Sequence, residues 1–445
     1  MKMLIKRQLH ISACLQFIRR PNFDVKGIIS KLPSYVDSVK GRELVVSDEL
    51  LSQLNQLQNK QQQIGDLNKE ISYVQTRRKQ IESEIKKDKS SIVQLKTELK
   101  NLKEKFQNFM AEQNSIKDSI LETCLSLPNL VHPDVPKTDP EIVHWINPKA
   151  EYKPDPIRDH HRIMVKKHLV DFDTAASVTG TSWYYLINEG AMLEQALVQY
   201  ACKKARSWGY KLCLPPSIVR NEVINACGFR PRDMNDERQI FHLSETKLGL
   251  TATAEIPLAA LGLEKTIDIE RSTPVVGVSR SYRAEAGSRG RDTKGLYRVH
   301  EFTKVELLHW AKPEESDATL EKLRAFQTEI ITELGLSGKV LNMPMNDLGS
   351  PAYKKYDIEV WMPGRGTFGE VSSASNCTDY QSRRLNSKFE DKSTGKLNYV
   401  HTLNGTAMAV PRAIIAIVEN FYEPSTERIT IPKPLRPYMD NMEYI

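Results

Sequence analysis

The longest unbroken signal in the chain is a double series of apolar residues at helical spacing. Residues 34–127 contain no proline, and apolar residues recur there at steps of three, four or seven, first from Leu50 to Ile85 and then from Ile92 to Ile120. Such heptad seams are typical of coiled coils. The polar segment KKDKSS, residues 86–91, breaks their phase. The pattern predicts a helical hairpin over about residues 48–125, with arms about 60 Å long at about 1.5 Å per residue.

The far half of this expected hairpin is basic. Between residues 77 and 105 there are ten Lys or Arg residues against five Asp or Glu residues. A basic tip on an antiparallel coiled coil suits the phosphate backbone of a nucleic acid. A dimerisation coil whose charges only keep it in solution fits the same composition.

The segments on either side of the hairpin differ from it in composition. The first 20 residues contain five Lys or Arg, and no acidic residue precedes Asp24. Basic residues interleaved with apolar ones favour an organellar transit segment over residues 1–23, with the mitochondrial matrix as the expected destination and the cytoplasm as the alternative. After an N-terminal domain over residues 24–127, the proline-rich stretch 128–150 is expected to be a linker.

Residues 151–445 are expected to form a catalytic domain of class α+β. A helix is predicted from Ala191 to Trp208, and strands are predicted around 251–258, 275–282, 296–310 and 356–361. Clustered strands of this kind indicate a largely antiparallel sheet. The sequence has no phosphate loop and no strand followed by GxGxxG, so the common nucleotide-binding folds are not supported. The six cysteines form no CxxC pair, and no apolar run approaches the length of a membrane span.

One predicted hairpin, SYRAEAGSRGRDTKGLYRVHEFTKVE, is dense with charge. Since side chains alternate across a strand, its apolar residues fall on one face and its charged residues on the other. The charged face would hold Ser279, Ser281, Arg283 and Glu285 before the glycine-rich turn, and Arg298, His300, Phe302, Lys304 and Glu306 after it. A single aromatic ring among cations suits a nucleotide, whose base stacks while its phosphates meet arginine. A solvated sheet face fits the pattern about equally well.

These residues resemble motif 2 of the class II aminoacyl-tRNA synthetases, and specifically of the seryl-tRNA synthetases. Further segments match that family in its own order, and they cover nearly the whole chain after the leader: LPNLVHPDVP, TGTSWYYLINEGAMLEQAL, GYKLCLPP, TATAEIPL, DIEVWMPGRGTFGEVSSASNCTDYQSRR, HTLNGTAMAVPRAIIAIVEN and IPKPLRPYM. By this resemblance motif 1 spans about 190–216, motif 2 about 275–308 and motif 3 about 401–420. The resemblance implies a homodimer built through motif 1, and a coiled-coil arm that binds the long variable arm of serine tRNA. The arm residues expected to contact the tRNA are Arg77, Arg78, Lys86 and Lys87.

The resemblance also implies roles for the residues that would bind ATP. Arg283 would hold the α-phosphate and the serine carboxylate, and Glu285 would contact the adenine amino group or the tRNA acceptor end. Phe302 would stack on adenine, with Arg412 covering the other face and reaching the γ-phosphate beside Arg298. The catalytic divalent cation, expected to be Mg²⁺, would be bound by Glu370 and Ser373.

For serine, the resemblance assigns the substrate amine to Glu306, helped by Thr253 and Glu255, and the substrate hydroxyl to Asn404 and Thr406. A site that hydrogen-bonds a hydroxyl rejects an analogue lacking it, because its own polar groups are then left unpaired. Two other classes of function remain as alternatives: a synthetase-like RNA-binding protein without catalysis, and a coiled-coil scaffold with an inert globular head.

Overall fold

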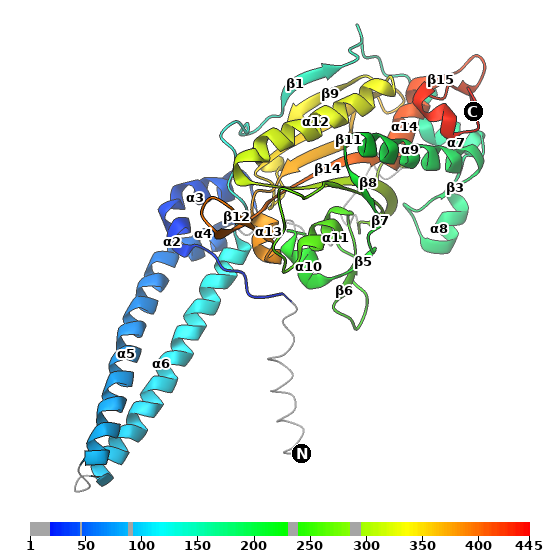
Figure 1. Cartoon of the computed structure of the whole chain (residues 1–445). Helices are drawn as coiled ribbons and strands as arrows, with labels where there is room; N and C mark the ends of the chain where they lie inside the picture. The colour runs from blue at the N-terminus through cyan, green and yellow to red at the C-terminus, as the bar shows by residue number, and fades with distance from the viewer. Residues whose placement is uncertain (1–17, 45–46, 88–91, 230–238, 285–294) are drawn as a thin grey trace. The chain divides into compact units, whose positions relative to one another are not determined.

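The computed structural model describes residues 18–44, 47–87, 92–229, 239–284 and 295–445, and the chain forms two compact units (Figure 1). In one unit, residues 22–128, every element that the structure describes is a helix. Its elements are α2 (Val25–Ser30), α3 (Leu32–Gly41), α4 (Ser47–Asn55), α5 (Leu57–Lys87) and α6 (Ile92–Ser126).

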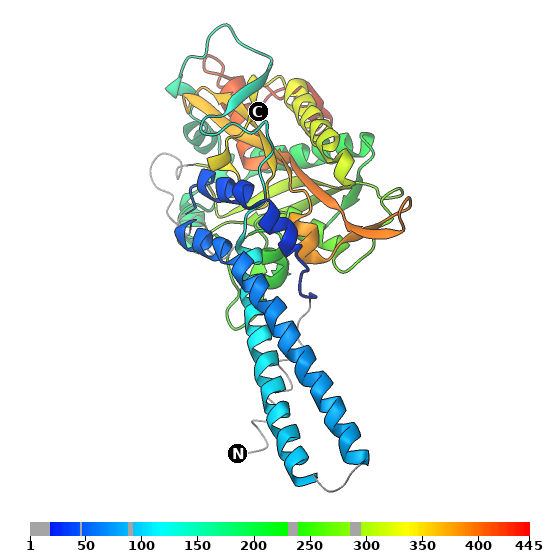
Figure 2. The ribbon, with the colours of Figure 1, turned by 90° about the vertical axis from the view of Figure 1, so that its left-hand side faces the viewer.

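The expected helical hairpin is confirmed by α5 and α6, which lie side by side in Figures 1 and 2. Val74, Ile81 and Leu102 are buried between them, with Phe106 and Phe109 packed against this seam. The first heptad series is not one helix, however, because α4 ends at Asn55 and α5 begins at Leu57. The 31 residues of α5 therefore span about 46 Å, less than the expected arm length.

The other unit contains an eight-stranded sheet with the order β1–β9–β10–β11–β14–β8–β7–β4. All neighbouring strands are antiparallel except β4 and β7, so the predicted α+β class is confirmed. The strands are β1 (Glu141–Ile146), β9 (Gly338–Asn342), β10 (Lys354–Met362), β11 (Thr367–Asn376), β14 (His401–Ala409), β8 (Glu301–Ala311), β7 (Val275–Tyr282) and β4 (Lys211–Cys213). The edge strand β1 lies inside the stretch 128–150 that we expected to be a linker.

Helices cover both faces of this sheet. Val305 and Leu307 of β8 belong to the large core that includes α9 (Asn188–Ser207), α12 (Ser316–Glu333) and α14 (Val410–Phe421). Leu308, which points to the opposite face, packs in a second core with α10 (Asn221–Ala226), α11 (Glu255–Ala259) and α13 (Tyr380–Leu385). The polar residues of the site share this second face.

Smaller elements complete the unit. They are α7 (His160–Lys166), α8 (Asp173–Thr179), the antiparallel pair β2 (Val170–Asp171) with β3 (Tyr185–Leu186), the pair β5 (Ile218–Arg220) with β6 (Leu248–Leu250), the hairpin β12 (Lys388–Asp391) with β13 (Lys396–Tyr399), and the pair β15 (Tyr422–Glu423) with β16 (Arg428–Ile429). No helix in the described ranges has both the length and the apolar character needed to cross a membrane.

Two of the four predicted strands differ from the structure. The segment 251–258 contains no strand, because α11 begins at Glu255, and the Thr253 hydroxyl accepts a hydrogen bond from the Glu255 backbone N–H at 3.3 Å. A short apolar run fits a strand or a buried helix equally well, which is why the pattern is ambiguous at this place. The strand predicted from Leu296 begins only at Glu301. The strands over 275–282 and 356–361 are confirmed as β7 and β10, and the predicted helix is α9.

Candidate functional site

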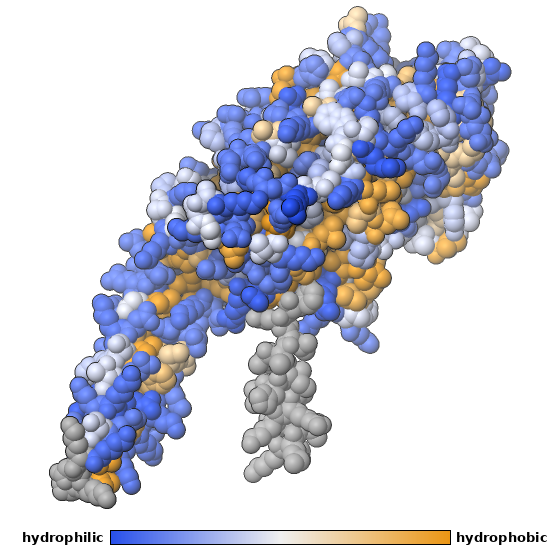
Figure 3. Space-filling view, in the orientation of Figure 1, coloured by the Kyte–Doolittle hydropathy of each residue, from blue (hydrophilic) through white to orange (hydrophobic). Residues whose placement is uncertain are grey.

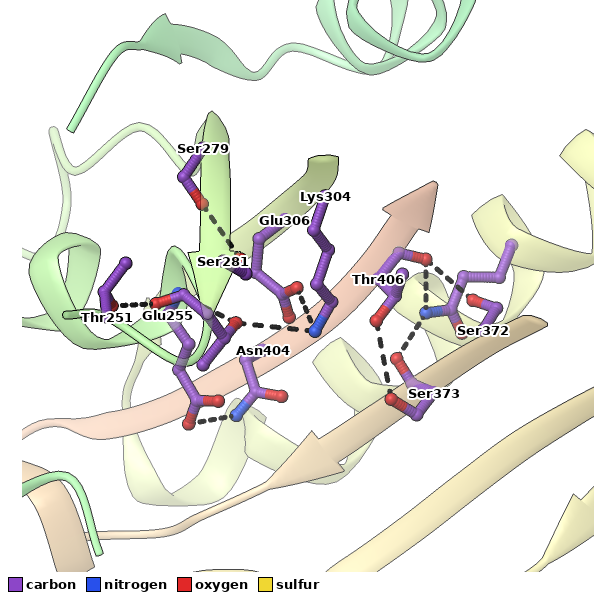
Figure 4. A network of polar contacts seen from close by, with 12 residues as sticks. Thr251, Glu255, Ser279, Ser281, Lys304, Glu306, Ser372, Ser373, Asn404 and Thr406 are labelled. Carbon is purple, nitrogen blue, oxygen red and sulfur yellow. Dashed lines mark hydrogen bonds and ion pairs between the residues drawn. The ribbon is translucent and has the colours of Figure 1, made fainter. Parts of the chain in front are cut away.

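A row of site residues crosses five strands on one face of the sheet. Gly277 of β7 pairs with Glu306 of β8, and Glu306 pairs with Thr406 of β14. The Thr406 hydroxyl lies 3.4 Å from that of Ser373 on β11, and Ser373 pairs with Asp357 of β10 (Figure 4). Antiparallel register therefore places these side chains in line, although they come from distant parts of the sequence.

The predicted charged face of the β7–β8 hairpin is confirmed for the residues that lie within the strands. Ser281 pairs with Phe302 and Ser279 pairs with Lys304, directly beside the row. The segment before Glu301 is not strand, so Arg298 is placed by a turn and not by strand alternation. Glu285 lies outside the described residues.

A β-bulge brings Glu370 and Ser373 to the same face. Residues three apart on a regular strand point to opposite sides of a sheet. In β11, however, Ser372 pairs with Ile358 and Glu370 pairs with Glu359, so Val371 is an extra residue. The extra residue restores the alternation, and the carboxylate and the hydroxyl expected to bind a metal ion both reach the site face.

One cavity gathers the residues expected to bind ATP. Its empty volume is about 560 Å³. Its lining includes Arg283, Arg298, Phe302, Glu370, Ser373 and Arg412. These are all the expected ATP residues that lie in the described part of the chain, and they come from the β7–β8 hairpin, β11 and the start of α14.

The charges in this cavity interact with one another. The Arg283 guanidinium lies 5.3 Å from the centroid of the Phe302 ring. Arg412 donates hydrogen bonds to the Glu370 carboxylate at 3.1 Å and to the Glu370 carbonyl at 3.0 Å. Burial opposes ionisation of Glu370, but the positive charges of Arg412, Lys355 and Arg283 outweigh it and lower the pKa of this carboxyl to about 2. Glu370 is therefore an anion at neutral pH.

Tyr297 is a lining residue that sequence reasoning missed. Its ring lies 4.7 Å from the Arg412 guanidinium and 3.6 Å from that of Arg365, so two cations contact it at the cavity wall. The aromatic and cationic composition around 297–302 carries a signal for this residue, but strand alternation assigns it to the core side of a strand that does not extend that far.

A second cluster, beside the cavity, contains the residues expected to bind serine. Asn404 Nδ2 donates to Glu255 Oε1 at 2.7 Å, and the Lys304 ammonium lies 2.5 Å from Glu306 Oε2 and 3.4 Å from the Thr253 hydroxyl (Figure 4). Strand alternation in the sequence predicts Lys304 on this face, but the resemblance assigns it no contact with a substrate.

Both carboxyl groups of the cluster are shifted toward the neutral form. Burial, together with the charge of Glu306, raises the pKa of Glu255 to about 7. Burial also raises the pKa of Glu306, although Lys304 opposes the shift. Besides Lys304, the charge of Arg283 acts on both carboxyl groups and favours their ionised forms.

The adjacent histidines near the start of the catalytic domain face different partners. His160 Nδ1 lies 2.8 Å from Glu419 Oε1, and its Nε2 accepts from the Leu296 backbone N–H at 3.3 Å. The His161 ring stacks on Phe172. The two rings therefore support structure on separate elements.

In the helical unit, the four expected tRNA-binding residues are not equivalent. Arg77 is paired with Glu98 at 2.9 Å and with Glu84 at 3.3 Å, which links α5 to α6. Arg78 lies 5.9 Å from the Phe106 ring, whereas Lys86 is exposed near the end of α5. The side chain of Lys87 lies outside the described residues.

Comparisons with known proteins agree with this geometry. Residues 240–421 match the family model described as the tRNA synthetase class II core domain (G, H, P, S and T). The chain is also 56% identical, over 446 aligned positions and 100% of both chains, to the mitochondrial serine–tRNA ligase of Saccharomyces cerevisiae. The chain belongs to the seryl-tRNA synthetases.

Two further seryl-tRNA synthetases support the assignment. The mitochondrial serine–tRNA ligase of Schizosaccharomyces pombe is 42% identical, covering 75% of this chain and 70% of that one. The crystal structure of the Pyrococcus horikoshii seryl-tRNA synthetase complexed with ATP superposes with a TM-score of 0.85 and 32% identity, over 95% of this chain and 99% of that one. Since both fungal relatives are mitochondrial by name, this seryl-tRNA synthetase is assigned to the mitochondrion.

Proposed function

We propose that this chain activates serine with ATP, forming seryl-adenylate and pyrophosphate, and then transfers the seryl group to the 3′ end of serine tRNA for mitochondrial translation. The observation that carries the proposal is the single sheet face on which an arginine-lined cavity adjoins a buried acidic pocket. The cavity suits a nucleoside triphosphate. The pocket suits a small ammonium compound.

Activation of serine needs no protein nucleophile, because the serine carboxylate itself attacks the α-phosphorus. The protein has to hold the two reactants in line and to spread the charge that develops on the phosphate. Arg283 lines the cavity, and its charge acts on both Glu370 and Glu255. It is therefore suited to hold the α-phosphate and the serine carboxylate together.

The remaining ATP contacts follow from the cavity lining. Phe302 offers a ring for adenine, and Arg298 and Arg412 offer guanidinium groups for the outer phosphates. The Pyrococcus horikoshii relative was solved complexed with ATP, which supports ATP as the nucleotide that this chain binds. Because Arg412 is paired with Glu370 in this structure, ATP would have to replace part of that ion pair.

We further propose that Glu370 and Ser373 bind Mg²⁺. Both are oxygen donors, which Mg²⁺ prefers, and the bulge in β11 places them on one face. The low pKa of Glu370 keeps that donor ionised. Mg²⁺ is usually held in such sites by one or two protein donors plus substrate phosphates, and it would supply positive charge to the phosphates of ATP.

For serine, Glu306 and Glu255 are proposed to bind the ammonium group with help from Thr253, and Asn404 and Thr406 to bind the hydroxyl. The Asn404 amide is oriented by its bond to Glu255, because Nδ2 donates to the carboxylate and Oδ1 is left to accept. An acceptor at this position selects a hydroxyl over the methyl group of alanine.

The helical arm is proposed to bind the long variable arm of serine tRNA through its exposed basic residues, Lys86 among them. A homodimer is proposed from the family's use of motif 1, here α9 and β4. The domain limits follow the same reasoning: a transit segment over 1–23, a tRNA-binding domain over 24–127 and a catalytic domain over 151–445.

Serine-dependent ATP–pyrophosphate exchange tests the proposal, using the purified chain without its leader and with alanine, threonine and cysteine as controls. We expect exchange with serine only. No exchange with any of these amino acids, from a folded protein, would contradict the enzyme and favour an RNA-binding protein without catalysis.

A further inference from the structure

Gln381, in helix α13, carries a buried amide that has no role in the reaction described above. Its side chain is fully buried. Its Nε2 donates to Glu255 Oε1 at 2.6 Å and to the Cys227 carbonyl at 3.3 Å, and its Oε1 accepts from the Thr402 hydroxyl at 2.8 Å. The amide therefore connects three separate segments of the catalytic unit, one of which contains Glu255.

The orientation of this amide is fixed by the chemistry of its partners. A carboxylate and a backbone carbonyl only accept hydrogen bonds, so both must face the NH₂ group of Gln381. The reversed amide would place its oxygen against two other oxygens in a buried site, which costs the desolvation of every group left unpaired. The Thr402 hydroxyl, which can donate, occupies the remaining side.

Glu255 is consequently held by one of its two oxygens. Oε1 accepts from Gln381 at 2.6 Å and from Asn404 at 2.7 Å. We propose that Gln381 is a positioning residue of the serine pocket: by holding Oε1 of Glu255, it turns Oε2 toward the ammonium group of the substrate. This inference rests on the proposed activation of serine.

The charges around Glu255 make this hydrogen bond important. Glu306 of β8 repels the carboxylate, whereas Lys304 of β8 and Arg283, after β7, attract it. The thiol of Cys227, at the end of α10, is buried and its pKa is raised, which leaves that group neutral. Burial is the main reason why the pKa of Glu255 rises to about 7, and the hydrogen bond from Gln381 opposes that rise. Loss of the bond would shift the pKa of Glu255 further upward.

Gln381→Met tests the role, because methionine has a similar length and no amide. The measurement is ATP–pyrophosphate exchange between pH 6 and pH 9, with KM determined separately for serine and for ATP. The expected result is a KM for serine raised about ten- to a hundredfold, as for a lost hydrogen bond to a charged group. The KM for ATP should stay within about twofold, because Gln381 does not line the ATP cavity. The low-pH limb of kcat/KM for serine should move to higher pH.

Gln327→Met is a matched control. Gln327 is another buried amide, and it donates to the carbonyls of Ser373 and Thr406 but makes no hydrogen bond to Glu255 within the described part of the chain. The Gln327→Met variant should leave the low-pH limb of kcat/KM for serine unchanged. Equal changes in both KM values for Gln381→Met, or an unmoved limb, would reduce Gln381 to a structural residue.

Thr402→Val keeps the inference testable if Gln381→Met does not fold. It removes the hydroxyl that holds Gln381 Oε1 and preserves the shape of the side chain. The KM for serine should rise about three- to tenfold, in line with the loss of one neutral hydrogen bond, with the same displacement of the pH limb. The wild-type protein is measured first. If the wild-type protein does not activate serine, the proposed function is wrong. If the wild type is active and Thr402→Val has the same KM for serine and the same pH limb, only the role of Gln381 is overturned.

Discussion

The sheet face and the helical arm both carry many charges, but they carry them differently. On the sheet, Glu255 and Glu306 are buried and Glu370 is partly buried, and each of these carboxyl groups has a shifted pKa. Along the arm, Figure 3 shows a mainly hydrophilic surface, and charged side chains such as that of Lys86 are exposed. Charge is part of a fixed structure in the first region and a property of the surface in the second.

This difference determines how each region responds to substitution. A buried charge interacts strongly with its neighbours, so removing one leaves another uncompensated. Exposed charges are screened by salt and contribute small amounts that add up. We therefore expect single substitutions to have large effects on the sheet face and small ones on the arm.

The largest effect is expected for Arg283→Ala. Arg283 acts on the carboxylates of both parts of the site, and its loss should lower kcat for serine-dependent ATP–pyrophosphate exchange by at least about 10²–10³-fold, the range for one lost charge-stabilising donor. Arg271→Ala is the matched control, because that side chain is 89% exposed and pairs only loosely with Asp268. Exchange by Arg283→Ala within tenfold of the control would show that the buried charge is not essential.

The second effect is a pH dependence that belongs to the sheet face alone. The pKa of Glu255 is raised to about 7, so this carboxyl is neutral below that pH in the serine-free protein. Binding of the serine ammonium should therefore be present above about pH 7 and be lost as the pH falls, with kcat/KM for serine dropping toward about tenfold per pH unit.

For stability the same pKa shift has the opposite sign. Since the folded pKa of Glu255 lies above the unfolded value, its contribution is present at low pH and lost as the pH rises through about 7. Parallel profiles of kcat/KM for serine and of melting temperature check both signs. A kcat/KM profile that is flat between pH 6 and pH 8 would contradict the buried state of Glu255.

The sequence predicted the regular parts of both regions. Heptad spacing was enough for α5 and α6, and period-two alternation was enough to place Phe302, Lys304 and Glu306 on one face. The break between α4 and α5 was not predictable, because no proline or glycine marks it. The helix α11 was missed because its five residues are too short for a helical period to be seen.

The site itself needed more than local pattern. The resemblance to a family supplied the residues, but only the register of β8, β14 and β11 explains how Glu306, Thr406 and Ser373 meet. The bulge that brings Glu370 to the same face as Ser373 leaves no mark in the sequence. Ion pairs such as Arg412 with Glu370 join strands far apart along the chain, so no spacing rule predicts them.

A smaller effect is expected from neutralising the arm. Changing Arg78, Lys86 and Lys87 to glutamine should leave serine-dependent exchange unchanged and weaken tRNA charging. The dependence of log K on log salt for tRNA should become shallower by up to about 0.9 for each phosphate that the arm no longer neutralises. Arginine or lysine in the same positions, with the charge retained, is the control. Charging that is untouched by the triple substitution would show that these residues do not bind tRNA.

The smallest effect on tRNA binding is expected from Arg77→Met, although Arg77 has the same charge as its neighbour. Its guanidinium is already paired with Glu98 of α6 and with Glu84, and these acids raise its pKa. A cation that is neutralised within the arm releases few counterions from tRNA, so the salt slope should change by less than that of Lys86→Gln. Arg77→Met should instead destabilise the arm itself, because it removes the ion pair that links α5 to α6. Amide hydrogen exchange in these two helices should therefore become faster. Glu98→Gln should cause the same loss of protection, because it breaks the same pair. A salt slope that falls as far in Arg77→Met as in Lys86→Gln would mean that Arg77 leaves its acidic partners to bind phosphate, and the contrast between fixed and surface charge would then fail within the arm.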